Sequence, residues 1–225
     1  MKLSYRLKIE AEVFGDLKLQ IQSLANLNET IDDLFATLER EGRPELLESL
    51  CPYFGVVWPS ARGLVQHLLA ADASRFRGAR VLEVGCGLAL PSLVAAKLGA
   101  SVTATDYHPD IGTFLERNLF LNGLSSAEVK FVPCNWQAED ALLGQYDWVI
   151  GSDILYERQH PGPVARILAR HVKKGEGRII LADPGRPYLQ NFSDEMNLLG
   201  FRCQVFTYQV YDTPAPKEVF VLELT

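Results

Sequence analysis

The sequence is poor in residues that bind metals or form disulfides. Its four cysteines are Cys51, Cys86, Cys134 and Cys203, and they lie far apart with no C-x-x-C pair. This spacing argues against a zinc site and against a disulfide framework. The four histidines are equally scattered and suggest no metal cluster. We therefore expect a protein without a bound metal that folds in a reducing compartment, the cytoplasm.

Positive charge and long apolar runs are also scarce. Lysine and arginine number 22 against 28 aspartates and glutamates, a net charge of −6, and no basic cluster exceeds two residues in a row. A nucleic-acid footprint needs a basic surface, so nucleic acid is a poor candidate partner. No segment approaches 18 uncharged apolar residues, and the first residues lack the apolar run of a signal peptide. We expect no membrane partner.

From Arg80 onward, apolar strand patterns alternate with helix patterns. This alternation predicts an α/β domain with a mostly parallel sheet and helices on both faces. The last two strands follow each other without a helix, so they predict an antiparallel pair at one sheet edge. The expected strands are 80–84, 101–105, 128–132, 146–152, 177–182, 201–210 and 218–224, and the expected helices are 89–98, 109–122, 161–172 and 187–199.

Residues 1–57 do not show the alternation of strand and helix patterns that follows. We therefore expect them to form an N-terminal cap over a main domain of residues 58–225. Two alternating runs, about 4–13 and 17–22, predict a hairpin. Asn28 or Thr30 can cap a helix that Gly42 ends. A further helix is expected after Trp58, with Pro59 in its first turn.

A glycine turn follows the first strand of the main domain. The run Glu83-Val84-Gly85-Cys86-Gly87 leads into a helix, and Asp106 ends the next strand. A side chain on Gly85 or Gly87 would block close approach of the backbone to a ligand. A carboxylate at the position of Asp106 can hold a ribose diol. This pattern predicts a nucleotide site.

Two neighbours of the turn narrow the choice of nucleotide. The third small position of a dinucleotide motif is occupied by Leu90, and Glu83 would repel a pyrophosphate. A carboxylate suits a ligand that carries an ammonium group. S-adenosylmethionine has that ammonium, a ribose diol and an adenine, and it has no phosphate.

These motifs and the terminal antiparallel pair resemble the class I, seven-strand S-adenosylmethionine-dependent methyltransferases. Further motifs resemble the lysine methyltransferase branch: Trp58-Pro59-Ser60, Asn135-Trp136, and Ser152-Asp153-Ile154-Leu155-Tyr156 with its D-x-x-Y pattern. The segment 182–187 resembles the subgroup that methylates the electron-transfer flavoprotein β-subunit. The resemblance implies a Rossmann-like fold and S-adenosyl-L-methionine as cofactor.

By the same resemblance, each motif has an expected role. Asn135 and Trp136 would hold the adenine, Trp58 would lie near the methionine end of the cofactor, and Ser152 would belong to the cofactor site. Asp153 would orient the acceptor amine and could accept its proton, and Tyr156 would supply a hydroxyl and an aromatic wall.

Plain structural roles remain open for several of these residues. Asp153 could cap the following helix, Tyr156 could pack in the core, and Trp58 could fasten the cap to the sheet. The segment 183–187 could be nothing more than a rigid turn. Within it, Arg186 is the residue that we would instead expect to contact an acidic substrate group.

The predicted function is protein-lysine N-methylation. Alternatives are a small-molecule N- or O-methyltransferase, a nucleic-acid methyltransferase, and a module that binds a nucleotide without turnover. The sequence does not identify the methyl acceptor or the oligomeric state.

Overall fold

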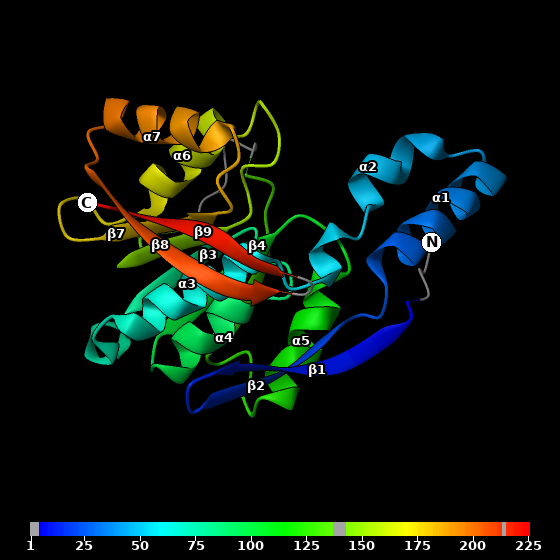
Figure 1. Ribbon diagram of the computed structural model, residues 1–225, viewed down its shortest axis with the longest axis horizontal. Helices are drawn as coiled ribbons and strands as arrows, with labels where there is room; N and C mark the ends of the chain where they lie inside the picture. Colours follow the sequence, from blue (N-terminus) through cyan, green and yellow to red (C-terminus); the bar gives the residue numbers. More distant parts are fainter. Residues whose placement is uncertain (1–4, 137–142, 213–214) are drawn as a thin grey trace.

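The computed structural model describes residues 5–136, 143–212 and 215–225. It is built around a seven-stranded sheet in the order β5-β4-β3-β6-β7-β9-β8 (Figure 1). The strands are β3 (Arg80–Val84), β4 (Ser101–Asp106), β5 (Val129–Pro133), β6 (Trp148–Ser152), β7 (Arg178–Asp183), β8 (Cys203–Asp212) and β9 (Ala215–Leu224).

The predicted α/β sheet is confirmed. Strands β3 to β7 pair in parallel, and β9 pairs antiparallel with both β7 and β8. Strand β8 begins and ends two residues later than expected, and β9 begins three residues earlier; the residues between them, Thr213 and Pro214, lie outside the described residues. The central strands are apolar throughout because helices cover both faces of the sheet.

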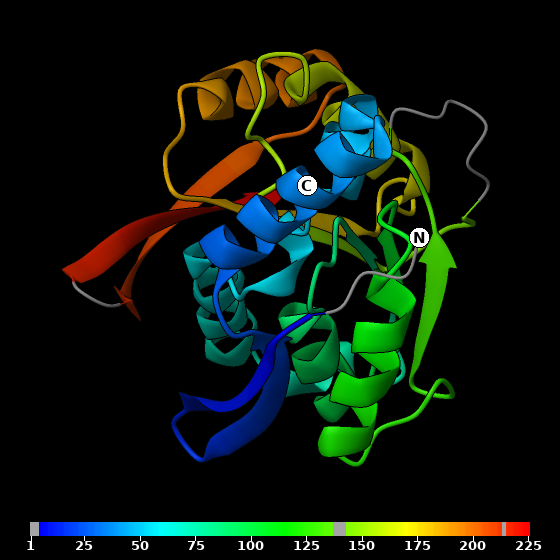
Figure 2. The same cartoon turned by 90° about the vertical axis from the view of Figure 1, so that its right-hand side faces the viewer.

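Two helical layers enclose the sheet, as predicted. Helices α3 (Pro59–Ala70), α4 (Leu90–Lys97) and α5 (Ile111–Leu121) lie on one face, and α6 (Pro161–His171) and α7 (Tyr188–Leu198) lie on the other (Figures 1 and 2). Each layer has its own apolar core. Leu64, Leu93 and Leu115 belong to the first core, and Leu168 and Phe192 belong to the second.

The N-terminal segment contains the predicted hairpin and helix. Its elements are β1 (Leu7–Phe14), β2 (Leu17–Leu24), α1 (Leu27–Glu41), η1 (Pro44–Leu46), α2 (Leu47–Leu50) and η2 (Tyr53–Gly55), and a further short turn, η3 (Ala73–Phe76), follows α3. The predicted cap of α1 is wrong, because the Oδ1 atom of Asn26 accepts the Glu29 amide at 3.3 Å. Asparagine three residues before glutamate is itself a capping signal.

Asn118 of α5 and Asn122, which caps the C-terminal end of that helix, hold the outer edge of β2 in place of a neighbouring strand. Asn118 Oδ1 accepts the Gln22 amide at 2.8 Å, and its Nδ2 donates to the Gln22 carbonyl at 3.4 Å. Asn122 makes the same pair of bonds with Gln20, at 2.9 and 2.8 Å. The hairpin therefore docks on α5 through backbone hydrogen bonds, and its buried residue Leu19 joins the first core.

Replacement of Asn118 by alanine is expected to destabilise the fold by about 2–3 kcal/mol, because it leaves the Gln22 backbone groups without partners. The side chain of Asn118 is fully buried. Asn122, which is only half-buried, is the matched control, and Asn122→Ala should cost less. Urea unfolding would measure both, and equal losses would contradict this account.

Within the described residues, no helix has both the length and the apolar composition that are needed to cross a membrane.

Candidate functional site

The predicted glycine turn joins β3 to the loop before α4. Gly85 and Gly87 have φ angles of 68° and 50°, in the left-handed region that favours glycine. A Cβ on Gly85 would stand 2.5 Å from Cγ2 of Ile154 and 2.8 Å from Cζ3 of Trp136. A Cβ on Gly87 would stand 3.3 Å from the carbonyl oxygen of Phe54. The turn therefore lies against three other segments of the chain.

Alanine at Gly85 is expected to destabilise the protein by about 2–4 kcal/mol, since it adds a clash to the strain of a positive φ. Gly123 is the matched control, because it has a φ of 64° and no atom lies within 4 Å of the place that a Cβ would take there. Gly123→Ala should cost only about 1 kcal/mol. Thermal unfolding of both variants measures the difference, and equal shifts would refute the close packing at Gly85.

Asp106 ties the turn to the end of β4. One carboxylate oxygen accepts the Gly87 amide at 3.0 Å, and the other accepts the Tyr107 amide at 2.8 Å. Burial raises the pKa of Asp106, and these backbone donors oppose the rise. The oxygen bonded to Tyr107 also accepts the His108 amide at 3.5 Å, and the oxygen bonded to Gly87 can accept a second hydrogen bond. The group is therefore placed at the strand end, as predicted, with acceptor capacity left for a ribose diol.

Glu83 lies under the turn rather than in an open cleft. Its side chain is fully buried, and its Oε2 accepts from the amide of Ser92, at 3.0 Å, and from the Ser92 hydroxyl. Its Oε1 has no hydrogen-bond partner among the described residues. Burial raises the pKa of Glu83 to about 8, against the effect of the Ser92 bonds. A buried carboxyl oxygen without a partner is costly unless a ligand or function uses it.

A cleft of about 1010 Å³ is lined in part by Trp136, whose ring lies against Gly85 of the turn. One wall comes from the carboxyl ends of the strands, where open α/β sheets bind ligands. It holds Tyr107, Asn135, Trp136, Tyr156, Glu157, Gln159 and His160. The other wall comes from the N-terminal segment and holds Ile31, Pro44, Glu45, Leu47, Glu48, Ser49, Cys51 and Tyr53. Three predicted residues, Asn135, Trp136 and Tyr156, thus meet in one cavity.

Asp153 is held by contacts from distant parts of the chain. Its φ of 60° is in the left-handed region, which is rare outside glycine. Its Oδ2 accepts the Ser60 amide at 3.2 Å, at the start of α3. Its Oδ1 pairs with the Arg186 guanidinium. Asp153 therefore caps α3, and the alternative that it caps the following helix is wrong.

Arg186 bridges two carboxylates and is already paired on both sides. Its Nη1 lies 2.9 Å from Asp183 Oδ2, and its Nη2 pairs with Asp153. Burial opposes the charged guanidinium, but the two carboxylates outweigh it and raise the pKa of Arg186. Burial also raises the pKa of Asp183, which accepts the amides of Gly185 and Arg186. These two ion pairs use one N–H of each Nη atom, so the contact of Arg186 with an acidic substrate group stays a prediction.

Three aromatic side chains that line the cleft, Tyr156, His160 and Trp136, pack against one another. The Tyr156 ring stands edge-on to His160 at 4.4 Å and to Trp136 at 6.3 Å, between ring centres. Tyr156 is 42% exposed, so it is a wall of the cleft rather than a core residue. Burial lowers the pKa of His160, whose Nδ1 lies 3.2 Å from the Ile154 carbonyl oxygen. The imidazole is therefore neutral near pH 7.

Other predicted residues lie behind the cleft. Ser152 is buried at the end of β6, and Trp58 precedes α3. The indole nitrogen of Trp58 donates to the Tyr53 carbonyl at 2.9 Å, so this residue fastens the N-terminal wall. Tyr53 and His160 line the cleft without having been predicted, because each becomes a site residue only through packing between distant segments.

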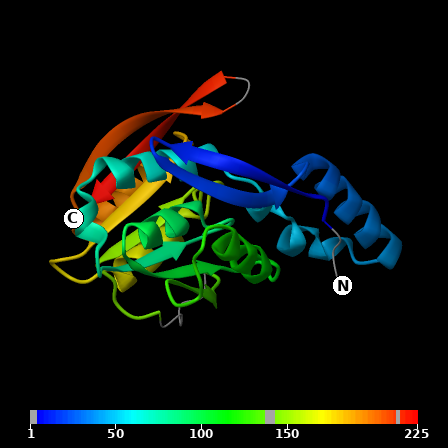
Figure 3. The same cartoon turned by 90° about the horizontal axis from the view of Figure 1, so that it is seen from below.

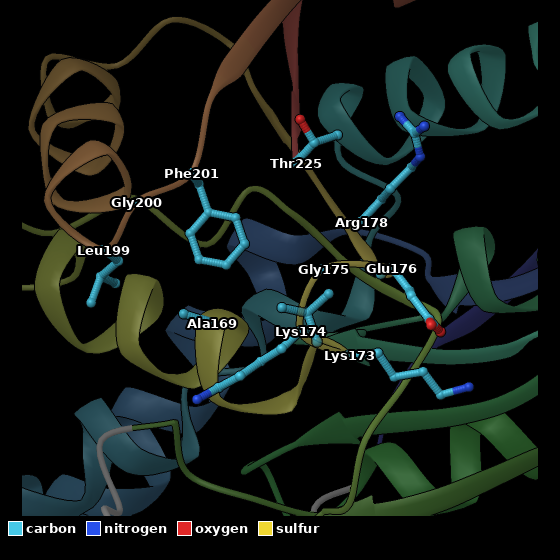
Figure 4. Close-up of a pocket in the computed structure, with 12 residues that line it drawn as sticks. Ala169, Lys173, Lys174, Gly175, Glu176, Arg178, Leu199, Gly200, Phe201 and Thr225 are labelled. Atoms are coloured by element: carbon cyan, nitrogen blue, oxygen red, sulfur yellow. The ribbon is translucent and has the colours of Figure 1, made fainter.

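A second hollow, of about 640 Å³, lies at the opposite end of the sheet, near the amino end of β7 (Figure 4). Its loop residues include Lys173, which pairs with Asp147, and Arg178, which pairs with Glu223. It lies near the amino end of a strand, whereas the glycine turn follows the carboxyl end of one. The larger cleft is therefore the candidate site.

Comparison with known proteins shows the family of the chain. A family model described as lysine methyltransferase matches residues 51–193, which include the turn, Asp106, Asp153 and Tyr156. The electron transfer flavoprotein beta subunit lysine methyltransferase of Xenopus laevis is 29% identical over 148 residues, covering 64% of this chain and 57% of that protein. The Mus musculus protein of the same name is 27% identical over 168 residues, covering 74% and 61%.

The chain thus spans 57% and 61% of the length of these two curated relatives, less than two thirds. Among solved structures, the magnesium protoporphyrin IX methyltransferase of Synechocystis PCC 6803 superposes with a TM-score of 0.58 at 16% identity. The match covers 88% of this chain and 97% of that one, and it supports the fold.

Proposed function

Because this chain belongs to the lysine methyltransferase family, we propose that it is an S-adenosylmethionine-dependent protein-lysine N-methyltransferase. The observation that carries the proposal is the cleft between the strand ends and the N-terminal wall. It brings the expected adenine residues Asn135 and Trp136 next to Tyr156 of the D-x-x-Y motif. Trp136 links this cleft to the glycine turn, because its ring lies against both Gly85 and Tyr156.

The donor set suits S-adenosylmethionine. Asp106 has acceptor capacity for the ribose hydroxyls, and the turn at Gly85 has no room for a side chain. The unpartnered oxygen of Glu83 beneath the turn favours a positive charge nearby, such as the methionine ammonium. Asn135 and Trp136 are the residues that would hold the adenine, by hydrogen bonding and stacking.

When bound, the cofactor supplies a methyl group on a sulfonium, which is open to in-line attack by a neutral amine. The protein must align that amine and dehydrate it. Tyr156 and Trp136 offer aromatic faces, which attract a cationic sulfonium or ammonium by about 0.5–2 kcal/mol. Asp153 orients the acceptor amine through its charge. Because Arg186 and Ser60 already engage both oxygens, Asp153 acts by positioning more than by removing a proton.

The walls of the cleft favour a cationic side chain on a protein surface. Glu45, Glu48 and Glu157 line it, and they give it negative charge. Tyr53 and Tyr156 are 55% and 42% exposed, so the cleft is accessible to a residue presented by another protein. The N-terminal residues 1–57 would act as the cap that selects this partner. None of the four cysteines forms a disulfide in the described structure, which suits the expected cytoplasmic location.

The proposal is tested by incubating the chain with methyl-labelled S-adenosylmethionine and a host lysate. We expect label in discrete protein bands, and mass spectrometry should place it on lysine side chains. Label found only in small molecules would instead support a small-molecule methyltransferase, and label in nucleic acid would support the third alternative.

Cofactor identity is tested separately by calorimetry. We expect S-adenosylmethionine to bind and NAD not to bind, because Leu90 occupies the third small position of a dinucleotide motif. Binding without any transfer to the lysate would indicate a nucleotide-binding module, and binding of NAD alone would refute the assignment of the turn.

A further inference from the structure

The N-terminal hairpin exposes a strand edge. Strand β1 pairs with β2 and with no other strand in the described part of the chain. The hairpin lies at the periphery, apart from the seven-stranded sheet (Figure 3). Along β1, Leu7, Ile9 and Val13 are 45%, 47% and 60% exposed. An exposed, apolar edge strand is a template for pairing with another strand.

The bonding of β2 shows which backbone groups of β1 point outward. Gln20 and Gln22 direct their backbone groups away from β1, toward the asparagines of α5. Their partners in the register are Ala11 and Ile9. In an antiparallel pair the bonded and non-bonded positions alternate, so Ala11 and Ile9 direct their own N–H and C=O groups to the open edge.

The sequence of this edge is complementary to itself. Residues 6–12 read Arg-Leu-Lys-Ile-Glu-Ala-Glu. If two copies pair antiparallel about Ile9, Lys8 of each copy faces Glu10 of the other, and Leu7 faces Ala11. Lys8 and Glu10 have exposed side chains, 42% and 63%, and already form a 2.8 Å ion pair within one copy. Opposite charges across strands stabilise a pair, and like charges destabilise it.

The neighbouring registers that keep the same bonding parity also contain opposite charges, Lys8 facing Glu12 or Arg6 facing Glu10, but each has a like-charged pair at its centre. A shift centred on Glu10 places two glutamates opposite each other. A shift centred on Lys8 places two lysines opposite each other. Charge and backbone bonding therefore select the single register centred on Ile9.

We propose that the β1 edge is a dimer interface, at which two copies of this chain join their hairpins into one four-stranded antiparallel sheet about a two-fold axis. The occupant of the edge is a second copy because the charge pattern matches its own reverse. A two-fold interface uses the same patch on both subunits, as this register does.

The test is a charge exchange measured by sedimentation velocity of the full chain. The wild-type chain, of 25.1 kDa, is expected to sediment as a dimer at about 100 µM. Lys8→Glu and Glu10→Lys should each raise the dimer dissociation constant about tenfold or more. The double variant restores opposite charges and should return to within about threefold of the wild type.

Two further variants separate edge pairing from general charge effects. Lys18→Glu makes the same charge change on an exposed residue of β2 and should leave the dimer unchanged. Ala11→Pro removes an outward N–H while sparing the β1–β2 bonds, and it should dissociate the dimer with little change in melting temperature. A monomeric wild type at about 100 µM, or a double variant as weak as the single ones, would overturn the proposal.

Discussion

The variant Asp153→Asn is expected to reduce kcat for methyl transfer by roughly 100-fold or more, with a change of less than about threefold in the affinity for S-adenosylmethionine. Asparagine keeps the volume and can still accept the Ser60 amide. It removes the charge that pairs with Arg186 and orients the acceptor amine. The effect should therefore fall on the reaction with the acceptor rather than on the cofactor.

Single-turnover transfer to the labelled protein would measure the rate, and calorimetry would measure cofactor affinity. Asp194→Asn, on the exposed side of α7, is the matched control and should leave both values unchanged. A rate loss that is matched by lost cofactor affinity would place Asp153 in the cofactor site. An unchanged rate would remove it from the mechanism.

The second large effect is expected at Glu83, where glutamine should stabilise the fold above pH 8 and weaken cofactor binding. The folded-state pKa is about 8, against an ordinary value of 4.5. Between these two values the folded state holds a proton that the unfolded state has lost, so stability falls as pH rises. Above pH 8 the loss is complete and levels off. Glutamine does not titrate and escapes this loss.

The stabilisation of Glu83→Gln relative to the wild type is therefore expected to grow from pH 5 to pH 8 and to reach about 2–4 kcal/mol. Thermal unfolding at pH 5 and pH 9 would measure it, with Glu195→Gln on exposed α7 as the control. Calorimetry at pH 9 on the same variant should show weaker S-adenosylmethionine binding, because glutamine lacks the charge that wild-type Glu83 carries above its pKa of about 8. A stability difference that is the same at both pH values would contradict the raised pKa.

Features encoded in one short segment could be predicted from the sequence. The turn at Gly85 and the carboxylate of Asp106 lie at strand ends, and each strand is recognised from its own apolar run. The supports of Asp153 could not be predicted in the same way. Ser60 and Arg186 are 93 and 33 residues away in the chain, so their contacts depend on the packing of α3 and the loop after β7 against the sheet.

The N-terminal segment shows the same limit. Its hairpin was recognisable from alternation alone, but the side chains that hold it belong to α5, about 100 residues later. The role of Trp58 also depends on a partner, the Tyr53 carbonyl, that no residue pattern identifies. Local periodicity thus predicts the elements, and the tertiary contacts decide which of their side chains form the site.

The asparagines of α5 have one more consequence, for how many chains can join. A two-stranded sheet with two open edges can add strands on both sides and grow into a filament. Asn118 and Asn122 occupy the backbone of β2, so this hairpin has only the β1 edge to offer within the described structure. In the dimer the β1 edge of each copy is paired with the other copy, so no open edge of the hairpin is left. Association through strand pairing must then stop at two chains. The amide side chains at α5 make the hydrogen bonds that a further strand would make, and they thereby prevent growth into a filament.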